Sequence, residues 1–176
     1  MTKCLVVYAS KYGATRDVAQ AIADGLGADL ASAVDQPDVQ PYDLLVVGSP
    51  IYSGTYLESI TDFIEANRKT LVHRKVAAFI CAAADQEVAF GLTGETGDLY
   101  TQQDYADGLA ELAGGDIISC RGFGGRLIPD QLDKHDRSTL DWFYRYLMRE
   151  PLKGFDLLDL PAAYRWGEEL REIVGR

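Results

Sequence analysis

The stretch CLVVYASKYGAT, residues 4–15, decides how the rest of the chain folds. Its first part, residues 4–8, is an apolar run with β-branched and aromatic residues, which is typical of a strand buried on both faces. A short polar loop follows. After the loop, Val18, Ile22 and Leu26 repeat at the spacing of one helix face. The order strand, tight loop, helix predicts the first unit of an α/β fold.

The loop SKYGAT, residues 10–15, has the features of a phosphate-binding turn. A loop this tight leaves several backbone N–H groups pointing into one concavity, at the positive end of the helix dipole. Ser10 and Thr15 offer hydroxyl groups, and Gly13 allows a positive φ angle or a close backbone approach. The loop is neither a Walker motif nor a GxGxxG dinucleotide fingerprint. On these residues alone, an ordinary turn without a ligand is an equal alternative.

The alternation of strands and helices continues along the chain. Further strands are predicted at residues 29–34, 44–48, 76–81 and 116–122. Helix starts are indicated where a hydroxyl side chain precedes an acid by three residues: Thr55–Glu58, Thr101–Asp104 and Ser138–Asp141. An extra segment after the fifth strand separates it from a terminal helix that starts at Asp159.

We therefore expect one domain, residues 1–176, of the α/β class. The predicted core is a doubly wound, parallel, five-stranded sheet in the order 2-1-3-4-5, with helices on both faces. Ligands of such sheets bind beyond the carboxyl ends of the strands, beside the first strand. The loops at residues 10–15, 50–56 and 82–100 converge there, so the sequence predicts a single ligand site.

Composition narrows the class of protein. The formal net charge of −10 argues against a nucleic-acid-binding protein and disfavours adhesion to anionic membranes. The 3 cysteines contain no CxxC pair and fit buried thiols in a reducing compartment better than a disulfide framework. Neither histidine has metal-ligand spacing, and no apolar run reaches transmembrane length. We expect a soluble, cytoplasmic protein without a metal.

Two motifs that each follow a strand, SKYGAT at 10–15 and GSPIYSGTY at 48–56, resemble the FMN-binding flavodoxin-like family. The resemblance covers nearly the whole chain. Within the family the chain is most similar to the menaquinone-dependent protoporphyrinogen IX oxidase branch. Tyr52 and Tyr56, the position of the extra segment, and the aromatic and basic run DWFYRY at 141–146 carry that similarity.

The resemblance implies a non-covalently bound FMN with three groups of contacts. The phosphate would be wrapped by Ser10, Lys11, Tyr12, Gly13, Ala14 and Thr15. The isoalloxazine ring would be bordered by Pro50, Ile51, Tyr52, Ser53 and Gly54. Its pyrimidine side would be reached by Ala82, Ala83, Ala84 and Asp85. Because the flavin carries the electrons, no side chain is named as a catalytic acid or base.

Three functions stay open at this point. The first is an FMN-dependent oxidoreductase of the protoporphyrinogen oxidase type, with a quinone or another small molecule as substrate. The second is a flavodoxin-type electron carrier that meets a redox partner protein, and the third is a cofactor-free binding module. The extra segment carries more acids, such as Asp130 and Asp133, than the oxidase pattern does. Contact with a membrane surface is therefore not favoured, and a homodimer stays open.

An open groove between the extra segment and the flavin would separate the first function from the second. An oxidase needs such a groove to admit its substrate, whereas a carrier needs none.

Overall fold

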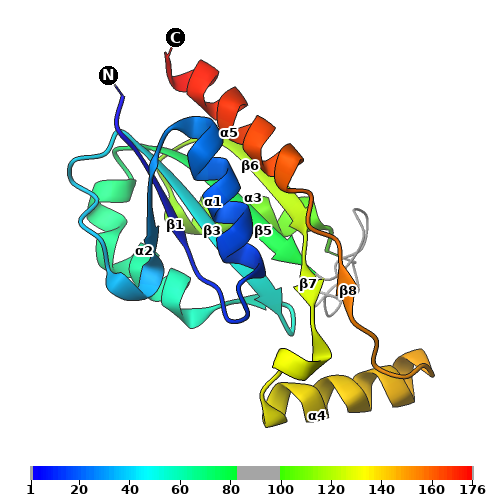
Figure 1. The fold of residues 1–176 in the computed structure, drawn as a ribbon. Helices are drawn as coiled ribbons and strands as arrows, with labels where there is room; N and C mark the ends of the chain where they lie inside the picture. Colours follow the sequence, from blue (N-terminus) through cyan, green and yellow to red (C-terminus); the bar gives the residue numbers. More distant parts are fainter. Residues whose placement is uncertain (1, 83–99, 176) are drawn as a thin grey trace.

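The structure is a computed structural model that describes residues 2–82 and 100–175. Its centre is a parallel sheet in the order β2-β1-β3-β5-β6 (Figure 1). These strands are β1 (Cys4–Tyr8), β2 (Asp29–Ser32), β3 (Leu44–Tyr52), β5 (Lys75–Ala82) and β6 (Asp116–Gly124). Numbered along the chain, the five parallel strands follow the order 2-1-3-4-5, so the predicted topology is confirmed.

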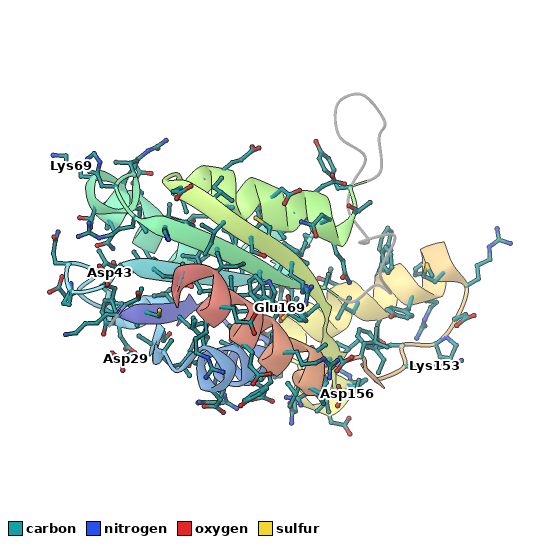
Figure 2. The ribbon with its side chains drawn as sticks, turned by 90° about the horizontal axis from the view of Figure 1, so that it is seen from above. Asp29, Asp43, Lys69, Lys153, Asp156 and Glu169 are labelled. Atoms are coloured by element: carbon teal, nitrogen blue, oxygen red, sulfur yellow. The ribbon has the colours of Figure 1, made fainter. Side chains whose placement is uncertain are left out.

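Helices cover both faces of the sheet (Figure 2). On one face lie α1 (Ala14–Leu26) and α5 (Leu160–Gly175), and on the other lie α2 (Glu58–Leu71) and α3 (Gln102–Ala113). The two-residue repeat of a strand divides the core: Val6 packs toward α1 and α5, whereas Leu5 and Val7 pack toward α2 and α3. This burial on both faces explains why the strands read as continuous apolar runs.

An aromatic cluster fixes α5 to the sheet. The indole of Trp166 is 1% exposed and lies edge-on to the rings of Phe79 and Phe123, with centroids 6.4 and 5.9 Å away. Its Nε1–H donates to Oγ of Ser119 at 3.0 Å, so its buried polar group is paired.

The extra segment lies beyond the carboxyl ends of the strands (Figure 1). It comprises β7 (Arg126–Leu127), a 3-10 turn η2 (Pro129–Gln131), α4 (Lys134–Phe143), a π-helical turn η3 (Tyr144–Met148) and β8 (Phe155–Asp156). The strands β7 and β8 pair antiparallel, and they connect α4 to the rest of the domain at its two ends. We call residues 125–156 the insert.

Two predicted helix starts are wrong. Thr55 does not begin a helix, because it forms β4 (Thr55–Tyr56), which folds back onto the end of β3. The N-cap residue of α2 is Leu57, and its N–H donates to Oγ of Ser49 at 3.1 Å. The insert helix starts at Lys134, ahead of the predicted Ser138–Asp141 pattern.

The reason for the earlier start of α4 is a better cap. Asp133 accepts the N–H of Asp136 at 2.8 Å, and aspartate is among the strongest N-cap residues. By contrast, the predicted Thr101–Asp104 capping box is confirmed, with Oγ1 of Thr101 accepting the Asp104 N–H at 3.1 Å. None of the helices in the described part of the chain is long and apolar enough to cross a membrane.

Candidate functional site

A cavity of about 270 Å³ lies at the carboxyl ends of β1, β3 and β5, between the sheet and the insert. The residues from the sheet side form what we call the core wall: Ser10, Tyr12, Ala14, Thr15, Pro50, Ile51, Tyr52, Ser53, Cys81 and Ala82. The residues from the other side form the insert wall: Gly125, Arg126, Leu127, Ile128, Leu132, Asp136, Thr139, Leu140, Phe143, Tyr144 and Phe155. Two parts of the chain that are far apart in the sequence therefore line this cavity together.

One end of the core wall has the geometry of an anion site. Gly13 is the N-cap of α1 with φ 93°, a left-handed conformation that favours glycine. Its N–H donates to Oγ of Ser10 at 3.0 Å, and its carbonyl accepts the first backbone bond of the helix, from Asp17, at 3.0 Å. The N–H groups of Ala14 and Thr15 precede that bond and have no acceptor within the helix. They lie at the positive end of its dipole.

The end of β3 and the turn that follows it supply the middle of the core wall. Ser49 is fully buried; its Oγ accepts the Leu57 N–H and donates to the Pro50 carbonyl at 2.8 Å. Two left-handed residues, Ser53 with φ 49° and Gly54 with φ 77°, then turn the chain back into β4. These contacts hold the Pro50–Tyr52 stretch against the cavity.

Tyr52 presents an aromatic and uncharged surface to the cavity. Its ring lies edge-on to Tyr12, with centroids 6.4 Å apart and an interplanar angle of 71°. Burial, with a smaller contribution from Tyr12, raises the pKa of Tyr52 to about 12. The phenol is therefore neutral at physiological pH, and a planar apolar ligand could pack on it without meeting a charge.

Four residues join the first loop to the insert, and we call them the clasp: Lys11, Tyr12, Asp133 and Asp136. Nζ of Lys11 lies 2.9 Å from Oδ2 of Asp133 and 2.6 Å from Oδ2 of Asp136. The Tyr12 hydroxyl donates to the same oxygen of Asp136 at 2.6 Å. The hydrogen bond to Asp136, followed by that to Asp133, raises the pKa of Lys11. The backbone N–H of Asp136, with help from Lys11, lowers the pKa of Asp133 to about 2.

The clasp accounts for the direction of Lys11. Its ammonium group faces two carboxylates at the start of α4, those of the N-cap residue Asp133 and of Asp136, and Lys11 is not among the cavity-lining residues. These ion pairs thus fix the loop of Ser10–Thr15 to the insert.

The structure brings most of the predicted site residues together around the cavity. Those that line it are Ser10, Tyr12, Ala14, Thr15, Pro50, Ile51, Tyr52, Ser53 and Ala82. Lys11, Gly13 and Gly54 belong to the same loops but do not line it. Ala83, Ala84 and Asp85 lie outside the described residues.

The insert wall was not predicted from the sequence. Most of it is apolar, and its aromatic members Phe143, Tyr144 and Phe155 are half-buried. Two of its members beside the first loop are charged: Asp136, which belongs to the clasp, and Arg126, whose Nη2 lies 2.7 Å from Oδ2 of Asp17 on α1. The available indication was the position of Arg126, directly after the glycine-rich end of a strand that reaches the ligand side of the sheet.

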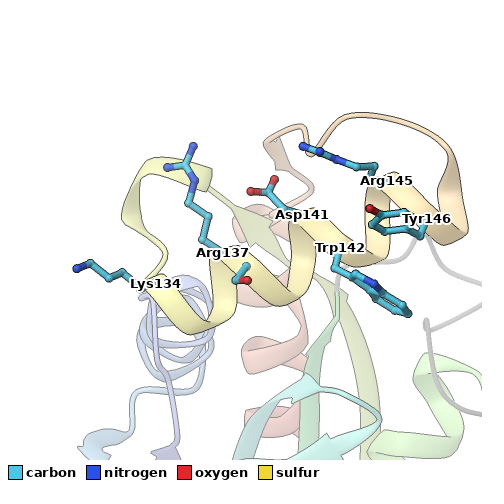
Figure 3. Close-up of a pocket in the computed structure, with 7 residues that line it drawn as sticks. Lys134, Arg137, Asp141, Trp142, Arg145 and Tyr146 are labelled. Atoms are coloured by element: carbon cyan, nitrogen blue, oxygen red, sulfur yellow. The ribbon is translucent and has the colours of Figure 1, made fainter.

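The outer face of α4 carries a separate, shallow hollow (Figure 3). Trp142 and Tyr146 stand beside each other there, 57% and 64% exposed, with ring centroids 5.8 Å apart. Lys134, Arg137 and Arg145 project from the same helix and turn. None of the residues that line this hollow lines the cavity, so the hollow belongs to a distinct surface.

The comparisons place the chain in a known family. A family model of the flavodoxin domain matches residues 5–150, so the chain belongs to the flavodoxin domain family. No curated protein matches the chain.

Three solved structures show the same fold at low sequence identity. An archaeal flavodoxin is 17% identical, with 99% of this chain and 100% of that one aligned at a TM-score of 0.62. A WrbA-like flavodoxin from Agrobacterium tumefaciens is 20% identical, with coverage of 99% and 98% and a TM-score of 0.56. A flavoprotein from Lactobacillus acidophilus, solved in complex with FMN, is 20% identical, with coverage of 69% and 93% and a TM-score of 0.52. The fold and family fit a redox protein, whereas the protoporphyrinogen oxidase branch receives no support from these comparisons.

Proposed function

We propose that this chain binds FMN non-covalently in the cavity and uses it as an oxidoreductase toward a second, mainly apolar molecule. One observation carries the proposal: a single cavity joins an anion-binding helix terminus to an aromatic core wall and an apolar insert wall. The first two features suit the phosphate and the ring of a flavin. The third suits a substrate that approaches the ring.

The residues present fit the phosphate of FMN by their donor chemistry. The Ser10 hydroxyl and the N–H groups of Ala14 and Thr15 gather at the N-terminus of α1. A phosphate on these groups would gain charge-assisted hydrogen bonds. The nearby carboxylate of Asp136 would not compete with it for these donors, because Asp136 is already bound by Lys11 and Tyr12.

The core wall also fits a planar ring. Pro50, Ile51 and the neutral Tyr52 offer apolar contacts at the end of β3, and Ala82 offers a small side chain at the end of β5. When bound, FMN supplies the electron transfer, and the protein supplies position, electrostatics and access.

The insert favours an oxidoreductase over a carrier. A carrier that passes electrons to proteins needs an accessible flavin edge and no apolar chamber beside it. Here Leu132, Leu140 and Phe143 face the core wall across the cavity, which is the groove that a substrate-using enzyme requires. Within this class we propose chemistry of the protoporphyrinogen oxidase type, with a quinone as electron acceptor. Its support is the resemblance of the two loops and the insert, together with this groove.

A flavodoxin-type carrier is the second candidate. The observation that favours it is the net charge of −10, because an acidic surface can steer a basic redox partner. A carrier would exchange electrons with such a protein and would show no saturable reaction with small quinones.

The first experiment is a visible absorption spectrum of the purified protein before and after addition of FMN and removal of the excess. Retained flavin bands are expected. The reduced protein is then mixed anaerobically with a soluble quinone, and saturable reoxidation supports the oxidoreductase. Retained flavin without saturable reoxidation would favour the carrier, and a chain that retains no flavin would leave only a cofactor-free binding module.

A further inference from the structure

Arg126 stands where the two walls of the cavity meet. It comes from β7 in the insert, yet its guanidinium reaches α1, 2.7 Å from Oδ2 of Asp17. It lines the cavity together with Ser10 and Thr15. A methyl group added at Gly13 would lie 4.0 Å from its Nη2, so the guanidinium is beside the N-cap of α1.

The backbone that carries Arg126 is held on both sides. The N–H of the preceding Gly125 donates to the carbonyl of Ala82 at 2.7 Å, and the carbonyl of Gly125 accepts from Leu157 at 2.9 Å. Arg126 itself is opposite Asp156 in the β7–β8 pair. Contacts at the backbone of this segment and at the guanidinium thus hold both ends of the Arg126 side chain.

Arg126 differs from the other cations near the loop. Lys11 has a single ammonium group that is paired with two carboxylates, whereas Arg126 has a guanidinium of which one nitrogen is paired with the single carboxylate of Asp17. Arg16 also approaches Asp17, at 3.3 Å, but its side chain is 59% exposed, whereas that of Arg126 is 23% exposed. A charge that is less exposed is screened less by water and salt, so Arg126 acts more strongly on an anion in the cavity.

We propose that Arg126 is a binding residue for the cofactor phosphate, so that the insert, and not only the core wall, recognises FMN by its charge. This inference rests on the proposed binding of FMN. A guanidinium has five N–H donors in a planar fork. Asp17 engages Nη2, and no acceptor for the other donors is found among the described residues, so these donors can reach a phosphate at the N-terminus of α1. One consequence is that loss of Arg126 affects FMN but not riboflavin, which has the same ring and no phosphate.

The test is an equilibrium titration of flavin-free protein with FMN and with riboflavin, followed by quenching of flavin fluorescence. In Arg126→Ala, the affinity for FMN should fall roughly ten- to a hundredfold, the range of a charge-assisted contact, and the affinity for riboflavin should not change. Arg126→Lys should recover part of the loss, because it keeps the charge without the fork. The FMN affinity of wild type should also depend more steeply on salt than that of Arg126→Ala.

Arg121→Ala is the matched control. Arg121 lies on β6, pairs with Glu169 at 3.5 Å and is not part of the cavity, so its removal costs the protein one charge and one ion pair elsewhere. Both flavins should bind this variant as they bind wild type. Retained riboflavin binding in Arg126→Ala also shows that this variant is folded.

The outcomes separate the two proposals. A wild-type protein that binds neither flavin overturns the proposed function and this inference with it. A wild-type protein that binds FMN, with an Arg126→Ala variant that binds it equally well, overturns this inference alone. Equal losses for both flavins in Arg126→Ala overturn it too, because they would mean that Arg126 supports the shape of the cavity and not the phosphate.

Discussion

The two walls of the cavity differ in chemistry and in how they are held. The core wall consists of the ends of β3 and β5, the short loops after β1 and β3, and the first turn of α1, and it places its polar donors at the N-terminus of α1. The insert wall is mostly apolar, and it is held by the β7–β8 pair and by the clasp from Lys11 to α4. The difference is consistent with two separate roles under the proposed function: the core wall binds the cofactor, and the insert wall admits the second molecule. The arginine at their junction is the exception.

The largest effect is expected from a charge placed in the core wall. Ser10→Asp puts a carboxylate beside the proposed phosphate, and repulsion between two anions a few ångströms apart should weaken FMN binding by roughly a hundredfold or more. The measurement is the titration with FMN described for Arg126. Ser138→Asp adds the same charge to the outer face of α4 and should leave FMN binding unchanged. Unchanged FMN binding in Ser10→Asp would place the phosphate elsewhere.

A backbone change tests the loop geometry itself. Gly13→Val forces a β-branched residue to adopt φ 93°, which should cost about 1–3 kcal/mol of unfolding free energy and also weaken FMN binding. Gly27→Ala is the control, because Gly27 has φ 73° at the other end of the same helix, with nothing within 4 Å of an added methyl. Chemical denaturation should show a lower free energy of unfolding for both variants. The titration should show weaker FMN binding in Gly13→Val alone.

The insert wall is tested by a change that spares the cofactor. Leu140→Ser removes a half-buried apolar side chain from the cavity, so quinone reoxidation should slow about tenfold while FMN affinity stays the same. Leu112→Ser removes the same side chain from the surface of α3, where it is 37% exposed, and should change neither property. A loss of FMN binding in Leu140→Ser would mean that the insert wall also contacts the ring. It would contradict the proposed separation of cofactor binding and substrate binding between the two walls.

The smallest effect is expected at the clasp. Asp133→Asn keeps the N-cap acceptor of α4 but removes the negative charge that faces Lys11. Because the folded state lowers the pKa of Asp133 from 3.8 to about 2, its contribution to stability is complete above pH 3.8 and disappears as the pH falls through 2. Wild type should therefore melt slightly higher than the variant near neutral pH, and the two melting temperatures should converge toward pH 2. A difference that does not depend on pH would exclude the ionic origin.

Much of the fold could be predicted from the sequence because its signals are local. Buried parallel strands appear as continuous apolar runs such as 44–48, and a tight loop before an amphipathic stretch indicates a strand–helix unit. The Thr101–Asp104 box was a correct helix start for the same reason. The Thr55–Glu58 pattern was misleading, because pairing of Thr55–Tyr56 with the end of β3 outweighed a weak local preference.

The candidate site could be predicted only in part. Ser10, Thr15 and Tyr52 follow strands whose carboxyl ends must meet, so their proximity could be derived from strand order. The same rule brings Arg126 to the ligand side of the sheet but not to Asp17, and no rule leads to Leu140. Their place depends on the path of the insert, which a pair of two-residue strands and a few ion pairs determine.

By itself, the sequence determined the parallel sheet, the order of its strands and the two loops that line one side of the cavity. Hydrophobic periodicity and loop chemistry act between neighbouring residues, so they are visible in the chain. Only the tertiary structure decided that Lys11 faces Asp133 and Asp136, that Arg126 reaches Asp17, and that α4 closes the other side. Each of these contacts joins residues about a hundred positions or more apart, and such pairings leave no periodic pattern because many surface charges could make them equally well.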